Sequence, residues 1–507
     1  MRKVFPLMLV LTMLFTGLFP LRLAAEETGG EGTDSAAEPI AISTVEEFEA
    51  MSATGSYYLT QDIDFGGKQY ETYIFESFSG TLDGRGHTIY HFSIASTAES
   101  ARVEGGIFRY LAVDGNTTIC NLQIGRPGEN ISFSFRDSGW AYGGLSAAQN
   151  SNLYLLTLDR VTMYADVSVS NGNNINVGGF LGASQNCLIT DCTLYGSVCA
   201  KTTKSWVNVA GFSANPKKVT GSFESCRNFA DITVFDAPTC RAGGLLGYTA
   251  FSVSVRDCMN AGSVSVATYD GAKEIGFARL GGIVAESFYA GSVFEGCFNY
   301  GTVSSPIHAG GIIGYNCRES TVRNCVNYGL LTAKDESIPA GAIYGATERD
   351  MIASGNKDMT GMLSGEVSEA VTSVGVQNTA ITDGIFDVRF LATVDALSYS
   401  AVGFEVEVFW YSEGTLVSKT LLLRSSHVYE EIYAEGADGS DRTVSAAELG
   451  GNWIAAISVF RVPADAESGN VTFVCRPFAV SEGATLRGGA SVYTYRAGEF
   501  VSAAPVS

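Results

Sequence analysis

The feature that most constrains this chain is an internal repeat. A pair of small residues, most often Gly-Gly, recurs along its middle and is followed each time by an apolar run. The second member of the pair falls at Gly106, Gly144, Gly179, Gly211, Gly244, Gly282, Gly311 and Gly341, at intervals of 29 to 38 residues. A unit this short cannot bury its own apolar face, so successive units must stack on one another.

Each unit has the same order of residues. The small pair opens an apolar strand, a loop follows, and a second strand ends in Cys before a C-x-N-x-Gly/Ala turn and a third strand. Alternating apolar and polar residues, rich in β-branched side chains, indicate strands. We expect the glycines and asparagines at the bends to supply left-handed backbone conformations. Three short strands per unit, stacked along an axis, predict an all-β chain built on a right-handed parallel β-helix.

Two of these units carry a resemblance to a known family. Residues 243–247 (GGLLG) and 310–314 (GGIIG) closely resemble the GLUG repeat of bacterial secreted and surface proteins, whereas the units at Ala210 and Ala340 depart from it at the first glycine. The resemblance covers residues 105–347. It implies a β-helix in an extracellular setting, and it brings no common catalytic residues.

The period of the pattern changes near residue 376. From there, six or seven strands with turn signals between them predict an antiparallel β-sandwich. Residues 398–406, 445–451 and 473–478 resemble a module appended to secreted proteins of clostridial bacteria, and the fold inferred for it is immunoglobulin-like.

The two ends of the β-helix and the N-terminus complete the predicted organisation. A basic start, an apolar run and small residues at Ala24 and Ala25 predict a secretory signal peptide. Ser43 or Thr44 with Glu47 forms a capping-box signal for a short helix that plugs the first rung. The predicted parts are a signal peptide (1–25), an acidic Gly-rich linker (26–40), a parallel β-helix with its N-terminal cap (41–349), a connector (350–375) and a β-sandwich (376–507).

Charge and hydropathy exclude several classes of partner. The chain has 32 Lys and Arg against 53 Asp and Glu, a net charge of −21, which repels nucleic acid and anionic lipid. After the signal peptide no segment approaches the ~18 continuous apolar residues of a spanning helix. We therefore expect a secreted or surface-held protein with no membrane insertion of the mature chain, and the oligomeric state stays open.

Five cysteines occupy one position of the repeat. Stacked strands would place them about 4.8 Å apart, as a ladder of small apolar thiols in the core. Disulfides among some members and metal binding are the alternatives. Eleven cysteines is an odd number, so at least one is free or pairs between chains. The ladder comprises Cys192, Cys226, Cys258, Cys297 and Cys325.

Metal and catalytic motifs are sparse. Asp62, Asp64 and Asp83 form a candidate calcium site, with turn-forming Asp at rung corners as the alternative. His87 and His91 share a strand face without an evident third ligand, and no cofactor is predicted. No G-x-S-x-G elbow occurs, and the motifs of the polygalacturonases are absent. A β-helix polysaccharide lyase or glycoside hydrolase is therefore an alternative rather than the leading hypothesis.

The best candidate for a binding site is where the rungs carry insertions. The two longest intervals contain residues 125–142 and 268–279, which are rich in aromatic side chains able to stack on sugars or anchor a protein. The alternative is that these rings pack onto the wall of the helix. The candidate ligand-binding residues are Phe133, Trp140, Tyr142, Trp206, Tyr269 and Asp270. The leading hypothesis is a non-catalytic, adhesin-like protein that binds glycan or extracellular protein; the other alternative is a purely structural surface protein.

Overall fold

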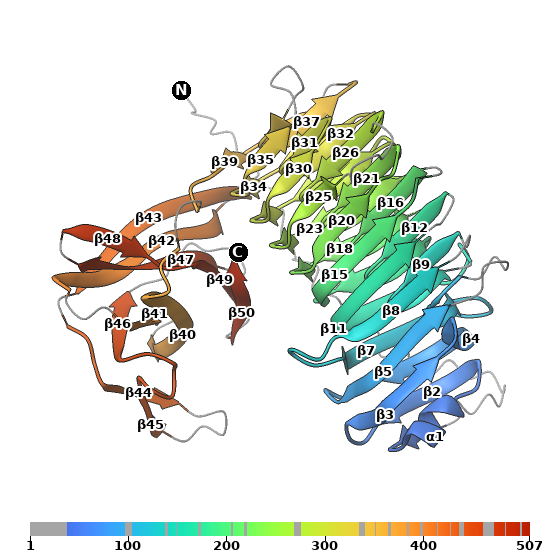
Figure 1. Ribbon diagram of the computed structural model, residues 1–507, viewed down its shortest axis with the longest axis horizontal. Helices are drawn as coiled ribbons and strands as arrows, with labels where there is room; N and C mark the ends of the chain where they lie inside the picture. Colours follow the sequence, from blue (N-terminus) through green and yellow to red (C-terminus); the bar gives the residue numbers. More distant parts are fainter. Residues whose placement is uncertain are drawn as a thin grey trace, which may run out of the picture. The chain divides into compact units, whose positions relative to one another are not determined.

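The computed structural model is almost entirely β (Figure 1). A parallel β-helix is followed by antiparallel sheets, which confirms the predicted fold class. The predicted signal peptide lies outside the described residues. The structure describes residues 38–506 except 97–103, 137–139, 150, 171–173, 204–205, 217–220, 268–274, 334–339, 350, 364–366, 383–384, 396–398, 413, 426, 436–440, 460–470, 482 and 497–498.

A short helix, α1 (Val45–Glu49), lies at the N-terminal end of the β-helix (Figure 1). The Glu47 N–H donates to Thr44 Oγ1 (3.2 Å), and the Thr44 N–H donates back to the Glu47 carboxylate (3.2 Å). This reciprocal pair confirms the predicted capping box. Phe48 is fully buried against the rings of Phe65 and Phe75, both 5.5 Å away between centroids. The helix thus covers the apolar end of the first rungs.

The β-helix has three sets of parallel strands. Sheet I contains β9 (Ala141–Gly143), β12 (Ile175–Gly178), β16 (Trp206–Ala210), β21 (Thr239–Gly243), β26 (Phe277–Gly281), β31 (His308–Gly310) and β36 (Ala340–Gly341). Sheet II contains β4 (Tyr73–Asp83), β6 (Gly106–Leu111), β10 (Ser146–Gln149), β13 (Leu181–Ser184), β17 (Ser213–Pro216), β22 (Leu246–Thr249), β27 (Val284–Ser287), β32 (Ile313–Asn316) and β37 (Tyr344–Thr347).

The remaining strands of the β-helix continue around each turn and are called sheet III. They are β1 (Ile40–Ile42), β2 (Thr54–Leu59), β3 (Ile63–Tyr70), β5 (Thr88–Ser96), β7 (Thr117–Ile124), β8 (Ile131–Arg136), β11 (Leu156–Ser170), β14 (Cys187–Thr190), β15 (Thr193–Lys201), β18 (Gly221–Glu224), β19 (Arg227–Asn228), β20 (Asp231–Phe235), β23 (Val253–Arg256), β24 (Met259–Asn260), β25 (Val264–Ala267), β28 (Ser292–Glu295), β29 (Phe298–Asn299), β30 (Val303–Ser305), β33 (Ser320–Arg323), β34 (Val326–Asn327), β35 (Leu331–Ala333), β38 (Ile352–Ser354) and β39 (Lys357–Asp358). A complete turn such as β21–β25 has five short strands, two more than predicted, because the chain also pairs before the small residues and at the C-x-N turn.

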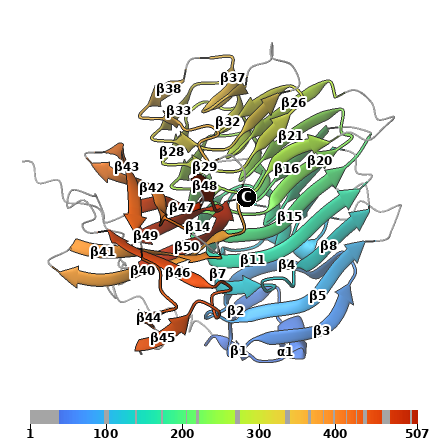
Figure 2. The ribbon, with the colours of Figure 1, turned by 60° about the vertical axis from the view of Figure 1, so that its left-hand side comes forward.

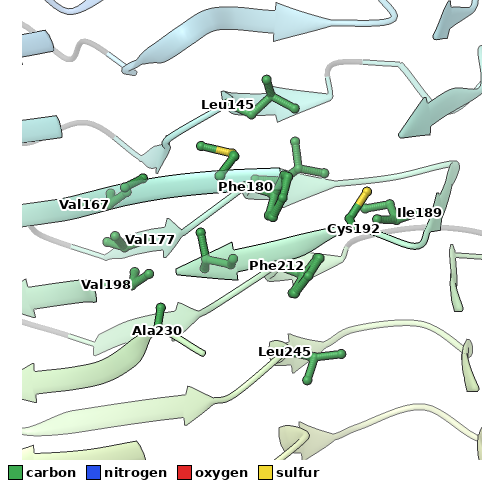
Figure 3. Close-up of a cluster of buried hydrophobic side chains, with 14 of the residues drawn as sticks. Leu145, Val167, Val177, Phe180, Ile189, Cys192, Val198, Phe212, Ala230 and Leu245 are labelled. Carbon is green, nitrogen blue, oxygen red and sulfur yellow. The ribbon is translucent and has the colours of Figure 1, made fainter. Parts of the chain in front are cut away.

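The core repeats from turn to turn. Phe180 and Phe212 stack with their ring centroids 4.8 Å apart, in line with Leu145 and Leu245 of the neighbouring units (Figure 3). All four side chains are fully buried. Equivalent positions therefore form continuous apolar columns, which is why a single unit cannot be stable alone.

The side chains of the asparagines in the C-x-N turns point into the interior of the β-helix, and their backbone is not left-handed. Asn228, Asn260, Asn299 and Asn327 are fully buried, and each Nδ2 donates to the Oδ1 of the next (2.7, 2.9 and 2.7 Å). The expected left-handed conformation lies instead just before the cysteine, as at Asp257 (φ 50°). A side-chain ladder satisfies polar groups that would otherwise be buried unpaired.

The five cysteines stack beside this asparagine ladder. All are fully buried, and each Sγ donates to the carbonyl oxygen two residues earlier, as Cys258 does to Arg256 (3.1 Å). All eleven cysteines of the chain are free thiols. Burial raises the pKa of the Cys192, Cys258 and Cys297 thiols well above the usual value.

We expect the ladder thiols to resist alkylation. Because all five side chains are fully buried and out of reach of the reagent, iodoacetamide at pH 8 should modify them at least ~100-fold more slowly in the native protein than in guanidinium. Mass-spectrometric mapping after timed quenching measures this, with half-buried Cys120 and Cys199 as internal references. Fast native labelling, or disulfide-linked ladder peptides, would contradict a core role.

The β-helix ends later than predicted, and the sandwich begins earlier. β38 and β39 still pair in register with β33 and β34, so residues 352–358 belong to the β-helix rather than to the connector. β40 starts at Val371 instead of 376. The terminal rung is partly exposed, so its strands are polar. The apolar alternation that predicts a strand is therefore missing from this stretch.

The C-terminal part is a sandwich of antiparallel sheets (Figures 1 and 2). One sheet has the order β40-β41-β46; the other has β43-β42-β47-β49-β50, with β48 paired to β47, and β44 and β45 form a hairpin. Phe390, Phe404 and Phe473 pack between the two sheets. The strands are β40 (Val371–Thr382), β41 (Ile385–Val394), β42 (Ala401–Ser412), β43 (Thr415–Ser425), β44 (Glu431–Glu435), β45 (Asp441–Ser445), β46 (Trp453–Val459), β47 (Val471–Ser481), β48 (Ala484–Arg487), β49 (Ala490–Arg496) and β50 (Glu499–Val506).

Candidate ligand-binding groove

Outward-facing side chains of sheets I and II form two columns on either side of the bend at each small pair. In β16, Val207 and Val209 are buried in the core, so the alternate residues Trp206 and Asn208 face outward. Strand register aligns the sheet I column as Ala141, Asn176, Asn208, Arg241, Arg279 and His308. The sheet II column is Tyr110, Ala148, Ala183, Asn215, Tyr248, Glu286 and Tyr315.

The two columns contact each other across the bend. Ala141 of sheet I packs with Ala148 and Ala183 of sheet II, and Arg241 and Arg279 of sheet I bond to Glu286 of sheet II. The outer surface of the bend is therefore a groove along the helix axis. A cavity of about 470 Å³ in this groove is lined by Trp140, Trp206, Asn208, Asn215, Thr239, Arg241 and Tyr248.

At the tryptophan end of the groove, defined by Trp140, Trp206, Asn208 and Asn215, a chain of hydrogen bonds fixes the amide orientations. Asn176 Nδ2 donates to the carbonyl oxygen of Trp140 (3.0 Å), which turns Asn176 Oδ1 toward Asn208 Nδ2 (2.8 Å). Asn208 Oδ1 must then point away from Asn176, since flipping the Asn208 amide would place its oxygen against Asn176 Oδ1.

Two amide oxygens at this end have no hydrogen-bond partner among the described residues. They are Oδ1 of Asn208 and Oδ1 of Asn215, whose side chains are 1% and 7% exposed. In the asparagine ladder of the interior, the preceding rung supplies the donor to the Oδ1 of Asn260, Asn299 and Asn327. In the groove the bonds run the other way, so a donor to Asn208 Oδ1 would have to come from the next rung, which has Arg241, and Arg241 Nε bonds to Glu286. A buried carbonyl oxygen without a donor costs about 1–3 kcal/mol, so a ligand that donates there would be stabilised.

At the arginine end, defined by Arg241, Arg279 and Glu286, one carboxylate serves two guanidinium groups. Glu286 is 1% exposed; its Oε1 accepts from Arg279 Nη1 (2.6 Å) and from Cys317 Sγ (3.4 Å), and its Oε2 accepts from Arg241 Nε. Both carboxylate oxygens are thus bonded within the protein. A buried carboxylate that is ion-paired to two guanidinium groups is poorly placed to act as an acid or base toward a ligand.

Aromatic rings hold these guanidinium groups in place. The Arg279 guanidinium lies 3.4 Å from the ring centroid of Tyr315 and 4.3 Å from that of Phe277, and Arg241 lies 4.7 Å from that of Tyr248. Such stacking favours a planar cation in a partly desolvated site. The arrangement fixes the shape of the groove.

The titratable groups beside this triad do not form a nucleophile. Burial, followed by the charge of Glu286, raises the pKa of Cys317 to about 12, so its thiol stays protonated at neutral pH. Burial and the nearby Arg279 lower the pKa of His308. His308 is therefore neutral near pH 7.

The structure brings together only part of the predicted binding set. Trp140 and Trp206, which are 66 positions apart in the chain, line the same groove. The prediction that Phe133 and Tyr142 face a ligand is wrong, because both are fully buried in the core of the β-helix. Tyr269 and Asp270 lie outside the described residues.

Several residues of the groove were not anticipated. Asn208, Arg241 and Arg279 stand two positions before the first residue of a small pair, and Asn215, Tyr248 and Glu286 stand four positions after the second. The sequence signal for these groove residues was therefore their fixed distance, in residues, from each small pair. Aligning the units on their glycines and reading the variable positions on both sides would have found this set.

The predicted calcium ligands do not converge. Each carboxylate has its own partner: Asp62 with Arg126 (2.8 Å), Asp64 with His91 (3.0 Å) and Asp83 with Asn121 (3.0 Å). Asp83 also accepts from the Arg85 N–H (2.9 Å), as a turn-forming Asp does. Throughout the described part of the chain, no three His, Cys, Asp or Glu side chains cluster in a way that could hold a metal ion.

The described residues include no helix that is long and apolar enough to cross a membrane.

Comparison with known proteins gives likenesses of fold. No protein-family model matches the chain, so the resemblance of its units to the GLUG repeat stays a prediction. No curated protein matches it. The chain is similar to the structure described as a putative immunoglobulin A1 protease from Bacteroides ovatus, at 16% identity and a TM-score of 0.39, over 63% of this chain and 86% of that one. It is also similar to a structure described as IgA1 protease, at 13% identity and a TM-score of 0.38, over 55% of this chain but 21% of that one.

Proposed function

We propose that this protein is a non-catalytic, extracellular carbohydrate-binding protein and that the groove is its glycan site. The observation that carries the proposal is the pairing of two tryptophan side chains with the unpartnered, buried Oδ1 of Asn208 in one groove. Sugars present apolar C–H faces that stack on aromatic rings and hydroxyl groups that donate hydrogen bonds. The extracellular setting rests on the predicted signal peptide and on the resemblance of the repeats.

The form of the groove favours an extended ligand. Its sheet I column runs through five successive steps from Ala141 to His308. At β-strand spacing this is about 24 Å. Such a length suits a polymer that lies along the axis better than a small, enclosed metabolite.

The groups in the groove support binding over hydrolysis. None of the seven described residues that line its cavity of about 470 Å³ is Asp or Glu. Glu286, at the arginine end, has both oxygens bonded to Arg241, Arg279 and Cys317. A glycosidase needs two carboxyl groups at a defined separation with access to the bond that is cleaved.

Removing either tryptophan should weaken glycan binding. Trp140→Ala and Trp206→Ala each delete a stacking surface, so we expect an approximately tenfold rise in the dissociation constant, equivalent to about 1.4 kcal/mol. Affinity electrophoresis of the mature chain, through gels cast with graded concentrations of plant, bacterial or mucin glycans, measures it.

A matched control is Tyr429→Ala, which removes an aromatic side chain that is 45% exposed and does not line the groove. Circular dichroism before each run verifies that every variant is folded. Unchanged mobility of the wild-type protein in every gel would refute the proposal. Equal loss of affinity in all three variants would refute the assignment to the groove.

A further inference from the structure

We infer that the groove selects a neutral, hydroxyl-rich glycan and discriminates against the carboxylated form of the same polymer. This inference rests on the proposed function and names the class of its ligand. Four features of the groove carry it: two unpartnered amide oxygens, the unpartnered Nε of Arg279, the neutralisation of its guanidinium groups, and its position on an acidic protein.

The unpartnered acceptors require a ligand that can donate. The hydrogen bonds from Asn208 to Asn176 and from Asn176 to Trp140 fix the amide of Asn208, a residue that lines the groove, and leave its buried Oδ1 without a partner among the described residues. Asn215 Oδ1 lies in the same groove, also without a partner among the described residues. A hydroxyl group can donate to such an oxygen, whereas an ionised carboxylate is acceptor-only and would place oxygen against oxygen.

The arginine end contains an unpartnered donor as well. Arg279 Nε is buried and has no acceptor among the described residues, while its Nη1 is bonded to Glu286. A ligand that satisfies both ends must therefore donate to Asn208 and accept from Arg279. Hydroxyl groups do both, since each has one donor hydrogen and two acceptor lone pairs.

Glu286 limits the attraction that the two guanidinium groups exert on an anion. Its carboxylate is bonded to both Arg241 and Arg279, whose side chains are 19% and 12% exposed. One of the two positive charges is thereby neutralised at contact distance, and aromatic rings cover the guanidinium faces. The chain as a whole has a net charge of −21, which disfavours the approach of a polyanion. Glu286 is therefore a specificity-determining residue in this proposal.

The test compares a neutral polymer that retards the wild-type protein with the same polymer after oxidation of its C6 hydroxymethyl groups to carboxylates. We expect the wild type to bind the neutral form at least tenfold more tightly at both 0.15 M and 1 M NaCl. At 1 M salt the Debye length falls to about 3 Å, so long-range repulsion is removed and contacts within the groove remain.

The outcomes separate the two claims. Equal or tighter binding of the oxidised polymer, or binding of natural polyuronates alone, would overturn the selectivity while leaving a glycan-binding function intact. A preference that disappears at 1 M salt would assign the discrimination to net charge and overturn the role of the groove. A wild-type protein that binds no glycan would refute the proposed function itself.

A matched pair of variants tests the role assigned to Glu286. Glu286→Gln keeps the shape but frees the second guanidinium charge, so affinity for the oxidised polymer should rise at least fivefold at 0.15 M salt. Glu295→Gln is the control, because Glu295 also bonds two arginines, Arg256 and Arg323, but on sheet III. Glu295→Gln should leave the preference unchanged. An unchanged preference in a folded Glu286→Gln protein would overturn the role of Glu286.

Discussion

Replacing Gly244 by alanine is expected to destabilise the β-helix by more than about 3 kcal/mol, the upper range for overpacked cores. A Cβ at this position would lie 2.0 Å from the carbonyl oxygen of Gly282 and 2.4 Å from the amide of Asn260. Neither neighbour can move away from the added Cβ without a large energetic cost. The first is backbone, and the second donates to Gly262 O (2.8 Å) and Asn299 Oδ1 (2.9 Å) within the buried ladder.

Urea unfolding followed by circular dichroism measures this loss, and size-exclusion chromatography reports any aggregated fraction. Gly115→Ala is the matched control, because the nearest atom to its added Cβ is Ser79 Cβ at 3.8 Å, an ordinary contact. We expect that variant to stay within about 0.5 kcal/mol of the wild type. If Gly244→Ala unfolded at the same urea concentration as Gly115→Ala, the close approach of successive turns at the small pair would be wrong.

The small pairs explain why the fold could be predicted from sequence. Their spacing is shorter than any self-sufficient domain, so stacking was the available way to bury the apolar strands. The sequence pattern located Asn260 and its equivalents correctly in the repeat but assigned them to left-handed bends. Both an interior ladder and a left-handed turn place Asn beside a bend, and a pattern of residue types does not say which way the side chain faces.

The candidate site was predictable only in part for a related reason. Phe133 was assigned to an insertion, yet Ile131, Phe133 and Phe135 alternate with polar residues, the pattern of a strand with one buried face, and β8 is such a strand. Arg241 and Glu286 were missed because they belong to different units and meet only across the bend between two sheets. Their contact depends on strand register, which residue spacing within one unit does not supply.

Truncating Glu286 to alanine is expected to cost about 3–5 kcal/mol, because it would leave two partly buried guanidinium groups without their shared carboxylate. Arg241 and Arg279 are 19% and 12% exposed and are enclosed by aromatic rings, so water cannot replace the lost partner fully. The same change would also remove the carboxylate that connects sheets I and II across the bend and so maintains the shape of the groove. Urea unfolding of Glu286→Ala at pH 7 and 0.15 M salt measures the loss.

The chain contains its own control for this argument. Glu295 bonds Arg256 (3.2 Å) and Arg323 (2.7 Å), the same composition as the Glu286 triad, but both of these arginines are 46% exposed. Exposed ion pairs contribute about 0–1 kcal/mol, so Glu295→Ala should cost no more than that. The difference between the two alanine variants isolates the effect of burial, since residue types and the number of ion pairs are matched. If both variants lost the same stability, the arginine end would be as well solvated as an open surface, and Arg241 and Arg279 would be free to bind an anion.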